Sequence, residues 1–214
     1  MPLSSKFGIR LMHENDYDQV LSLLTNSFFH DEPIVQCLQV TEVLEFSKNV
    51  IHNCLHDKCS CVAYDTETNQ IVAICLNEII YKNNKEEINE SNEKIRFILE
   101  LFMNMQKDLN IFDQLNVDTL LHIFILNVDK TVRGHGLGSR LISKSIEYGK
   151  ELKLGGAYAE ASNVYSLNCF KQQQFENFNE LIYLDYNPER LANLNDKMYD
   201  RCYLVARKFK FSIL

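Results

Sequence analysis

A glycine-rich stretch, VDKTVRGHGLGSRL at residues 128–141, limits the possible folds of this chain more than any other segment. It follows an apolar run and precedes a segment with the apolar spacing of a helix. Gly134, Gly136 and Gly138 are three glycines within five residues, which lets the backbone turn tightly and approach a ligand closely. The following helix presents free N–H groups and a positive dipole end to any anion. The pattern predicts a pyrophosphate cradle built mainly from backbone; the alternative, a tight turn without a ligand, would not need three glycines.

Two common phosphate-binding loops do not match this stretch. A P-loop requires Gly-Lys-Ser/Thr, but Gly138 is followed by Ser139 and Arg140. In a Rossmann fingerprint, Ser139 would occupy the position of the third glycine. The Arg-x-x-Gly-x-Gly arrangement that starts at Arg133 instead resembles the coenzyme A signature of the GNAT superfamily of N-acetyltransferases.

This resemblance implies that acetyl-coenzyme A is the co-substrate. No Cys, His or carboxylate cluster has metal-ligand spacing, so no metal ion is expected. It implies that backbone groups at the end of the preceding strand hold the pantetheine arm and polarise the thioester, at Leu126, Asn127 and Val128. It further implies that the loop and the first helical turn hold the pyrophosphate, through Arg133, Gly134, His135, Gly136, Leu137, Gly138 and Ser139.

The remaining periodicities predict an α/β chain. Strands are expected at residues 7–12, 59–64, 70–81, 120–128, 154–162, 175–186 and 199–211. Helices are expected at residues 14–29, 41–55, 95–109, 136–151 and 163–174, with a polar connector at 82–92. This order is similar to that of the GNAT fold, a central mixed twisted sheet of about seven strands, flanked by helices and splayed between the fourth and fifth strands. The resemblance extends over about residues 7–211, so we expect a single N-acetyltransferase domain over 1–214.

Two further segments resemble one branch of that superfamily, the insect arylalkylamine N-acetyltransferases. Ser162 and Ser166 are four residues apart, with Tyr165 before the second serine. Far upstream, Asp31-Glu32-Pro33-Ile34 follows two phenylalanines and is similar to the Asp-Glu-Pro-Leu segment of those enzymes. The resemblance implies that Glu32 is the general base, that Ser162 and Ser166 act with it, and that the substrate is an arylalkylamine or biogenic amine. Without the resemblance, Glu32 would be interpreted as an exposed loop carboxylate and the serines as helix caps.

The chemistry of amine acetylation requires a base. A primary alkylamine has a pKa near 10 and is almost wholly protonated at pH 7, whereas only the neutral amine attacks a thioester. We expect Glu32 to lie at the C-terminal, negative end of a helix beside apolar Phe28, Phe29 and Ile34, so that both the dipole and burial raise its pKa.

Two positions depart from the family pattern. Phe170 stands where many family members have a tyrosine that protonates the leaving thiolate, so we expect this proton to come from Ser166 or water. Gln174 stands where the family has a glycine, so we expect a different or strained turn there.

Three other side chains have open interpretations. His122 matches the first of two histidines on this strand in the vertebrate arylalkylamine enzymes, but Phe124 occupies the second position, which favours a hydrogen-bonded structural histidine. His30 is expected at the surface, and His135 is expected near a coenzyme phosphate. Cys169 offers an acyl-cysteine route, which direct attack in a ternary complex makes less favoured.

Composition limits the possible partners. The net charge of −7 argues against nucleic acid or an anionic membrane as a partner and favours a small cationic substrate. Seven scattered cysteines are typical of reduced thiols in a cytoplasmic protein, and neither a signal peptide nor a membrane span is predicted. The oligomeric state, monomer or weak dimer, stays open. Other acceptors, such as polyamines, other aliphatic amines or protein N-termini, and a non-catalytic acyl-coenzyme A-binding module also stay open.

Overall fold

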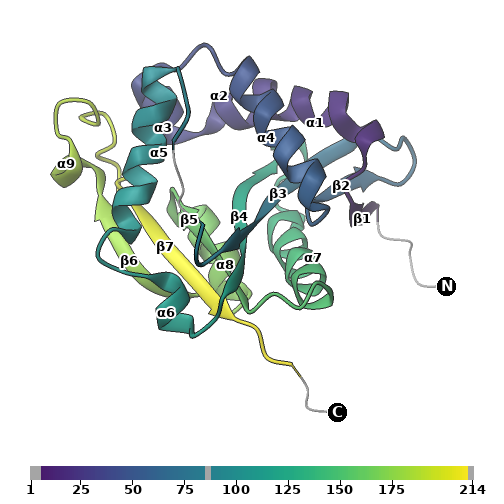
Figure 1. Ribbon diagram of the computed structural model, residues 1–214. Coiled ribbons are helices and arrows are strands. Elements are labelled where there is room, and N and C mark those ends of the chain that lie inside the picture. The colour runs from purple at the N-terminus through teal and green to yellow at the C-terminus, as the bar shows by residue number, and fades with distance from the viewer. Residues whose placement is uncertain (1–5, 85–87, 212–214) are drawn as a thin grey trace.

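A mixed β-sheet organises the molecule (Figure 1). The computed structural model describes residues 6–84 and 88–211, so residues 85–87 of the expected polar connector lie outside the described residues. Within the described residues the sheet has seven strands, in the order β1-β2-β3-β4-β5-β7-β6. Their bounds are β1 Phe7–Leu11, β2 Cys61–Asp65, β3 Ile71–Tyr81, β4 Thr119–Val128, β5 Gly156–Ala161, β6 Glu176–Ile182 and β7 Arg201–Lys208. All neighbouring strands are antiparallel except β4 and β5, which are parallel, and this confirms the predicted mixed sheet.

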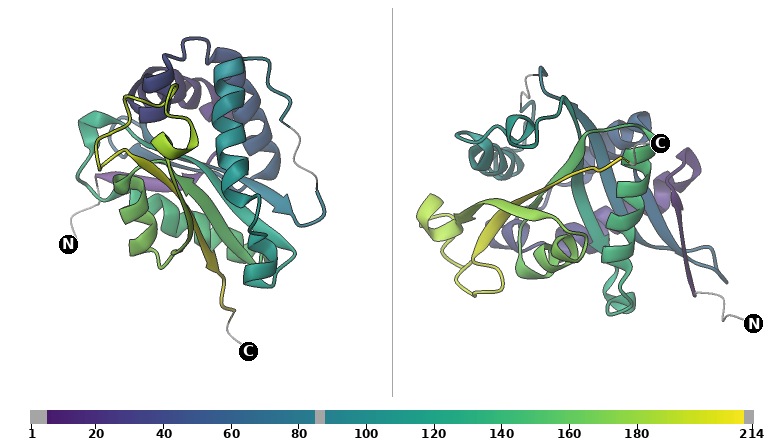
Figure 2. Two further views of the ribbon diagram at one scale, coloured as in Figure 1. Left: turned by 90° about the vertical axis from the view of Figure 1, so that its left-hand side faces the viewer. Right: turned by 90° about the horizontal axis from the view of Figure 1, so that it is seen from below.

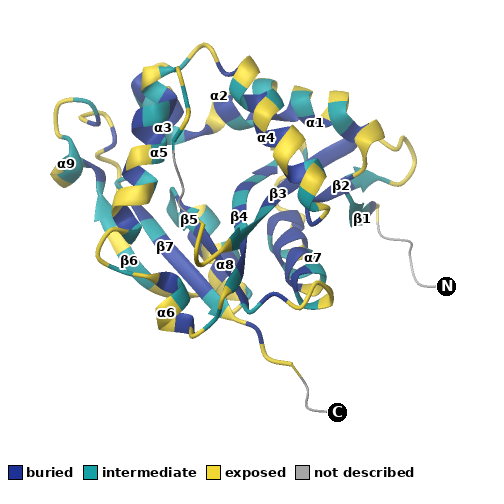
Figure 3. Cartoon of the chain, in the orientation of Figure 1, coloured by how far each residue is buried: buried dark blue, intermediate teal, exposed yellow. Residues whose placement is uncertain are grey.

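Helices cover both faces of the sheet (Figures 1 and 2). One face carries α1 (Tyr17–Leu23), α3 (Pro33–Leu38), α4 (Leu44–Asp57) and α5 (Glu93–Gln106), and the other carries α7 (Leu137–Glu151) and α8 (Val164–Gln172). Adjacent strand residues point to opposite faces, so Leu120 packs in the first core and Leu121 in the second. Figure 3 shows buried residues along the strands and on the sides of the helices that face the sheet. None of the described helices is long and apolar enough to span a lipid bilayer.

The central parallel pair separates along its length. β4 and β5 are in register only at Leu120–Gly156, Leu121–Ala157 and His122–Tyr158. Both strands continue beyond this point, β4 to Val128 and β5 to Ala161, without further pairing to each other. This confirms the predicted splay between the fourth and fifth strands. It also leaves the β5-facing edge of β4 free for a ligand, because backbone groups there are not used in the sheet.

A β-bulge in β4 redirects the side chains next to this opening. β3 pairs Leu76 with Ile125 but Asn77 with Ile123, so Phe124 is the extra residue. After the bulge, Asn127 points to the face that carries α1, whereas Leu126 and Val128 pack with the core under α7. The simple alternation expected for residues 120–128 therefore changes phase in the middle of the strand.

The N-terminal helical region is more divided than the sequence pattern indicated. The expected helix at residues 14–29 consists of a 3₁₀ turn η1 (Glu14–Asp16), α1, a π-helical turn η2 (Leu24–Phe28) and a short α2 (Phe29–Asp31). Pro33 does not only end this region but also begins α3, because proline is well suited to the first position of a helix. The sequence analysis also did not predict α6 (Ile111–Leu115) and α9 (Tyr183–Tyr186), which are too short to show a periodic pattern.

Candidate active site

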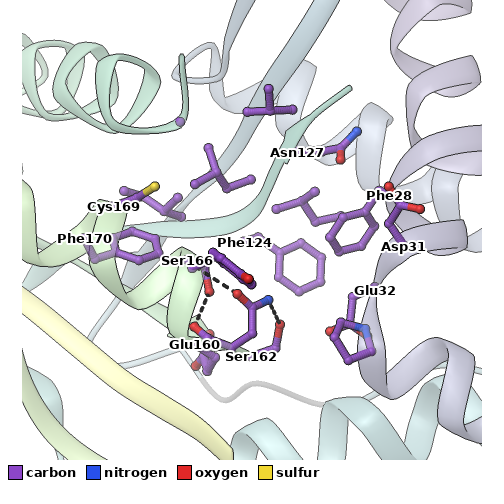
Figure 4. A pocket seen from close by; sticks show the side chains of 18 of the residues that line it. Phe28, Asp31, Glu32, Phe124, Asn127, Glu160, Ser162, Ser166, Cys169 and Phe170 are labelled. Carbon is purple, nitrogen blue, oxygen red and sulfur yellow. Dashed lines mark hydrogen bonds between the residues drawn. The ribbon is translucent and has the colours of Figure 1, made fainter. Parts of the chain in front are cut away.

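A cavity of about 730 Å³ lies where β4 and β5 separate. Its walls combine the cradle loop, the ends of both strands, the region from η2 to α3, and one side of α5. Figure 4 shows Phe28, Asp31 and Glu32 on one side of this cavity, and Ser162, Ser166, Cys169 and Phe170 on the other. Segments far apart in the sequence therefore meet at one opening.

The cradle has the backbone conformation that its glycines predict. Gly134 has φ +86° and Gly136 has φ +69°, a left-handed region that disfavours residues with a Cβ. Gly136 is the N-cap of α7, so the first amides of that helix have no intrahelical acceptor. Gly138 packs closely: a Cβ there would lie 3.2 Å from the Sγ atom of Cys169. These features suit an anion held by backbone N–H groups at the start of α7.

Arg133 connects the cradle to the opposite wall. Its Nε donates to the carbonyl oxygen of Val128 at 3.0 Å, and its Nη2 lies 2.6 Å from Oδ2 of Asp31. The side chain is half exposed, so the guanidinium remains accessible to a phosphate. This ion pair places the loop beside the residue that precedes Glu32.

The strand before the cradle is fixed by a buried polar pair. The Nδ2 atom of Asn127 donates to the hydroxyl of Ser27 at 3.1 Å, which ties β4 to the π-helical turn η2. Leu126, Asn127 and Val128 all line the cavity, as do Arg133, Gly134, Gly136, Leu137, Gly138 and Ser139. The side chain of His135 has a different position: its Nδ1 lies 3.0 Å from the carbonyl oxygen of Val132, and its ring packs against Phe7. Among the cradle residues in the described chain, His135 does not belong to the cavity lining.

Glu32 is a buried carboxylate with one free oxygen. It is the N-cap of α3, and its Oε2 accepts a hydrogen bond from the Val35 amide at 2.8 Å. Oε1 is buried and has no hydrogen-bond partner among the described residues. The hydroxyl of Ser162 also favours the charged carboxylate. Burial outweighs these contacts and raises the pKa of Glu32.

Glu32 lies at the C-terminal end of a helix, as expected, but a second helix begins directly after it. Because α3 begins directly at Pro33, Glu32 lies at the N-terminal, positive end of that helix as well as after α2. The amides of α3 therefore lower the pKa of Glu32, and burial alone accounts for the net rise.

The two serines differ in their contacts. The Oγ of Ser166 donates to the carbonyl oxygen of Asn163 at 2.9 Å. The Oγ of Ser162 accepts from Nδ2 of Asn163 at 3.4 Å, and its carbonyl oxygen accepts from the Tyr183 hydroxyl at 2.9 Å. The cap of α8 is Asn163, whose side chain accepts from the Ser166 amide, so the cap role expected as the alternative for the serines belongs to their neighbour. Both serines line the cavity.

Aromatic side chains form one wall of the cavity. Phe28 and Phe29 lie 5.0 Å apart, Phe29 and Phe46 6.0 Å, and Phe46 and Phe124 6.3 Å between ring centroids. All three pairs are edge-to-face, an arrangement that favours aromatic packing. Only the first two of these four residues were expected in the site. Phe46 and Phe124 come from α4 and the bulge in β4, and their convergence has no signal in the local sequence.

Two histidines and one cysteine had open interpretations, and the structure shows their surroundings. His122 is hydrogen-bonded within the sheet, as favoured, with Nε2 2.8 Å from Oε2 of Glu160. His30 is exposed, as expected. Cys169 lines the cavity, but burial raises the pKa of its thiol, which disfavours a nucleophilic thiolate.

The two departures from the family pattern have clear local structures. Phe170 is buried and packs edge-to-face on Phe175, with a centroid separation of 5.1 Å, so it supplies packing and no proton. Gln174 has φ +61°, which confirms that the turn retains the glycine-like conformation and carries backbone strain.

Glu160 is the principal site residue that the sequence analysis missed. It lines the cavity from β5, two residues before Ser162, and its side chain is only 6% exposed. The alternation of a strand, which places residues 160 and 162 on the same face, was a signal that could have found it.

The two parallel strands separate along their length, and a glycine cradle and a helix follow the first of them. This arrangement defines the N-acetyltransferase class of α/β fold. The chain belongs to the acetyltransferase (GNAT) family, whose sequence model matches residues 45–175. This family uses acetyl-coenzyme A. Among the described residues, no group of three or more His, Cys, Asp or Glu side chains is arranged to hold a metal ion.

Solved structures of similar fold include several amine acetyltransferases. Arylalkylamine N-acetyltransferase 2 from Aedes aegypti is 24% identical, with a TM-score of 0.86 over 95% of this chain and 99% of that chain. Polyamine N-acetyltransferase from Drosophila melanogaster, described as forming N-acetylagmatine, is 19% identical, with a TM-score of 0.78 over 95% of this chain and 100% of that one. A putative arylalkylamine N-acetyltransferase 7 from the yellow fever mosquito is 17% identical, with a TM-score of 0.86 over 94% and 87% of the two chains. At these identities the likeness concerns the fold.

Proposed function

We propose that this protein transfers the acetyl group of acetyl-coenzyme A to the primary amine of an arylalkylamine, such as an aromatic biogenic amine. The observation that carries the proposal is the free, buried Oε1 of Glu32 beside Ser162 at the edge of an aromatic-walled cavity. A buried carboxylate with a raised pKa is a better base for an ammonium group than an exposed one. The resemblance of the sequence to insect arylalkylamine enzymes, and the similar fold of one such enzyme, support this choice.

In this proposal the residues have separate tasks. The cradle from Arg133 to Ser139 holds the pyrophosphate, and backbone groups at Leu126, Asn127 and Val128 hold the pantetheine arm and polarise the thioester. Phe28, Phe29 and Tyr165, which line the cavity, contact the aryl group. Acetyl-coenzyme A supplies the activated acetyl group.

The reaction proceeds by direct attack in a ternary complex. Glu32 accepts a proton from the ammonium group, directly or through water, and the neutral amine forms the new C–N bond at the acetyl carbon. The C–S bond breaks, and the thiolate receives a proton through Ser166 or water, because Phe170 cannot donate one. Ser162, on the wall opposite Glu32, assists the proton transfer.

A second candidate is the acetylation of polyamines or other aliphatic amines. The carboxylate of Glu160 inside the cavity favours it, since an acceptor with a second cationic group would be attracted there. The similar fold of a polyamine N-acetyltransferase also supports this second candidate.

The test is release of coenzyme A from acetyl-coenzyme A across a panel of amines: tryptamine, dopamine, histamine, spermidine and a peptide with a free N-terminus. We expect turnover with the arylalkylamines. Turnover only with spermidine would contradict the arylalkylamine proposal and favour the second candidate. Binding of acetyl-coenzyme A without turnover of any amine would contradict the catalytic roles and favour an acyl-coenzyme A-binding module.

A further inference from the structure

The amine end of the cavity contains a second carboxylate that the proposed acetyl transfer does not use. Glu160 lies in β5, which ends at Ala161, and Ser162 directly follows that end. Only one residue separates Glu160 from Ser162, so their Cα atoms are at most about 7 Å apart, and both residues line the cavity. Figure 4 shows Glu160 and Ser162 next to each other in the cavity wall. Glu32 faces Ser162 from the opposite wall. A molecule whose amine lies between Glu32 and Ser162 therefore has its other end within reach of Glu160.

The position of Glu160 is fixed from two sides. His122 on β4 has its Nε2 2.8 Å from Oε2, and Gln106 at the end of α5 donates to Oε1 at 2.9 Å. His122 is held in turn by stacking on Tyr158, with ring centroids 4.4 Å apart and ring planes 3° apart. A carboxylate offers about four acceptor positions, so a further acceptor position remains on each oxygen of Glu160. The group is thus oriented before any substrate binds, which reduces the entropy lost on binding.

Aromatic side chains line the same cavity as Glu160. Phe102, one turn before Gln106 on α5, and Phe124 on β4 both line the same cavity. A carboxylate in such a place is costly to bury, and each further hydrogen bond to it is worth more than in water.

We propose that Glu160 accepts a hydrogen bond from the far end of the acceptor amine. On this basis the site selects amines that carry a distal donor, either a ring hydroxyl or a second cationic nitrogen, over amines of similar size that end in hydrocarbon. Glu160 is then a specificity-determining residue. The inference rests on the proposed amine acetylation and adds a substrate class to it.

The experiment compares matched amines that differ only in the distal donor. Tyramine against phenethylamine tests the ring hydroxyl, and 1,4-diaminobutane against pentylamine tests the second nitrogen. For each pair, kcat/KM is measured, together with the Kd of the amine for protein saturated with coenzyme A. We expect wild type to prefer the donor-bearing member of at least one pair by about tenfold or more, as for a hydrogen bond to a charged acceptor.

Glu160→Gln is the informative variant. The glutamine retains the shape, and its amide can donate to Nε2 of His122 in the other tautomer, so the wall is preserved. We expect it to reduce the preference about fivefold or more, because a charge-assisted hydrogen bond becomes a neutral one. Glu100→Gln, an exposed glutamate on α5, is the matched control and leaves the preference unchanged.

The outcomes separate the two proposals. A wild-type preference within about twofold for both pairs, or an unchanged preference in Glu160→Gln, overturns the role of Glu160 even when amines are acetylated. If no amine is turned over, the proposed activity fails, and the binding preference for the coenzyme A-saturated protein still decides the inference. No binding by any amine overturns both.

Discussion

At Glu32, local backbone contacts and burial act on one carboxylate in opposite directions. The amides at the start of α3 favour its charged form, whereas burial favours its neutral form and raises the pKa overall. Because the folded chain then holds the proton more tightly than the unfolded chain, this contribution to stability is fully present below the unfolded pKa. It is lost as the pH rises through the higher folded pKa. At neutral pH the buried charge of Glu32 therefore lowers the stability of the fold, whereas the same carboxylate is available as a base.

Glu32→Gln is expected to lower activity and raise stability together. The amide cannot accept the ammonium proton, so kcat/KM should fall by about 10²–10⁴-fold near pH 7, the usual contribution of a positioned base. The loss should decrease toward pH 10, where the amine itself becomes neutral. Glutamine still accepts from the Val35 amide and leaves no buried charge, so unfolding at pH 7 should require about 1 kcal/mol more.

The measurements are pH–rate profiles with a saturating acetyl donor and urea unfolding at pH 4 and pH 7. The stabilisation should be larger at pH 7 than at pH 4, because the wild-type carboxyl is neutral at the lower pH. A parallel loss of activity at every pH would remove Glu32 from the role of base. Glu93→Gln, at an exposed glutamate paired with Arg190, is the control, since burial contributes little there.

At the scale of elements, the cradle depends on backbone conformation more than on side chains. Gly136 has φ +69°, and a Cβ at this position would meet no atom within 4 Å. Space is therefore available for a side chain, and the only barrier is the left-handed conformation. Alanine is disfavoured in this conformation by about 1–2 kcal/mol, whereas asparagine tolerates it better.

Gly136→Ala should therefore weaken acetyl-coenzyme A binding more than Gly136→Asn, although asparagine is larger. We expect alanine to lower the free energy of unfolding by about 1 kcal/mol and to raise the Kd of coenzyme A by about tenfold, as the amides at the start of α7 lose their alignment. Calorimetric titration with coenzyme A and thermal unfolding measure the two effects. If asparagine were the more harmful of the two, crowding in the cradle would replace backbone strain as the explanation.

The elements differ in how far their sequences reveal them. The cradle, β4 and α7 were predictable because the glycine spacing and the long apolar periods are local signals. The bulge at Phe124 was not predictable, since it depends on how β3 pairs with β4 and no glycine marks it. The start of α3 at Pro33 was missed, since no helix was expected between residues 29 and 41.

The residues of the candidate site also differ in how far the local sequence reveals them. Glu32, Ser162 and the cradle residues were expected because they form short motifs, although their roles remain predictions. Strand alternation could have suggested Glu160, but its contacts come from Gln106 on α5 and His122 on β4, which are distant in sequence. Local sequence identifies residues with motif spacing, and only tertiary packing shows which other side chains converge on them.

At the scale of the whole molecule, the sheet consists of two parts with a narrow junction. β1 to β4 are antiparallel on one side, and β5, β7 and β6 are antiparallel on the other. Among the residues that the structure describes, the two parts are joined in the sheet only where Leu120 to His122 pair with Gly156 to Tyr158. Beyond His122, the β5-facing backbone of β4 is available to a ligand, and a ligand bound in this opening bridges both parts.

Coenzyme A binding should therefore slow hydrogen exchange at two separate places. Amides of residues 134–139 should become protected because they face the pyrophosphate, and amides of β4 after His122 should become protected because the opening is filled. At a concentration 100 times Kd, the free energy of unfolding should rise by about 2.7 kcal/mol, with a corresponding rise in Tm. Hydrogen exchange followed by mass spectrometry, with and without coenzyme A, measures the first effect, and thermal unfolding measures the second.

Amides of β2, which is paired with β1 and β3, serve as the internal control and should change only to the extent that global stability rises. Protection confined to β6 and β7, with residues 134–139 unchanged at saturation, would place the cofactor outside the splayed strands and contradict the proposed cradle.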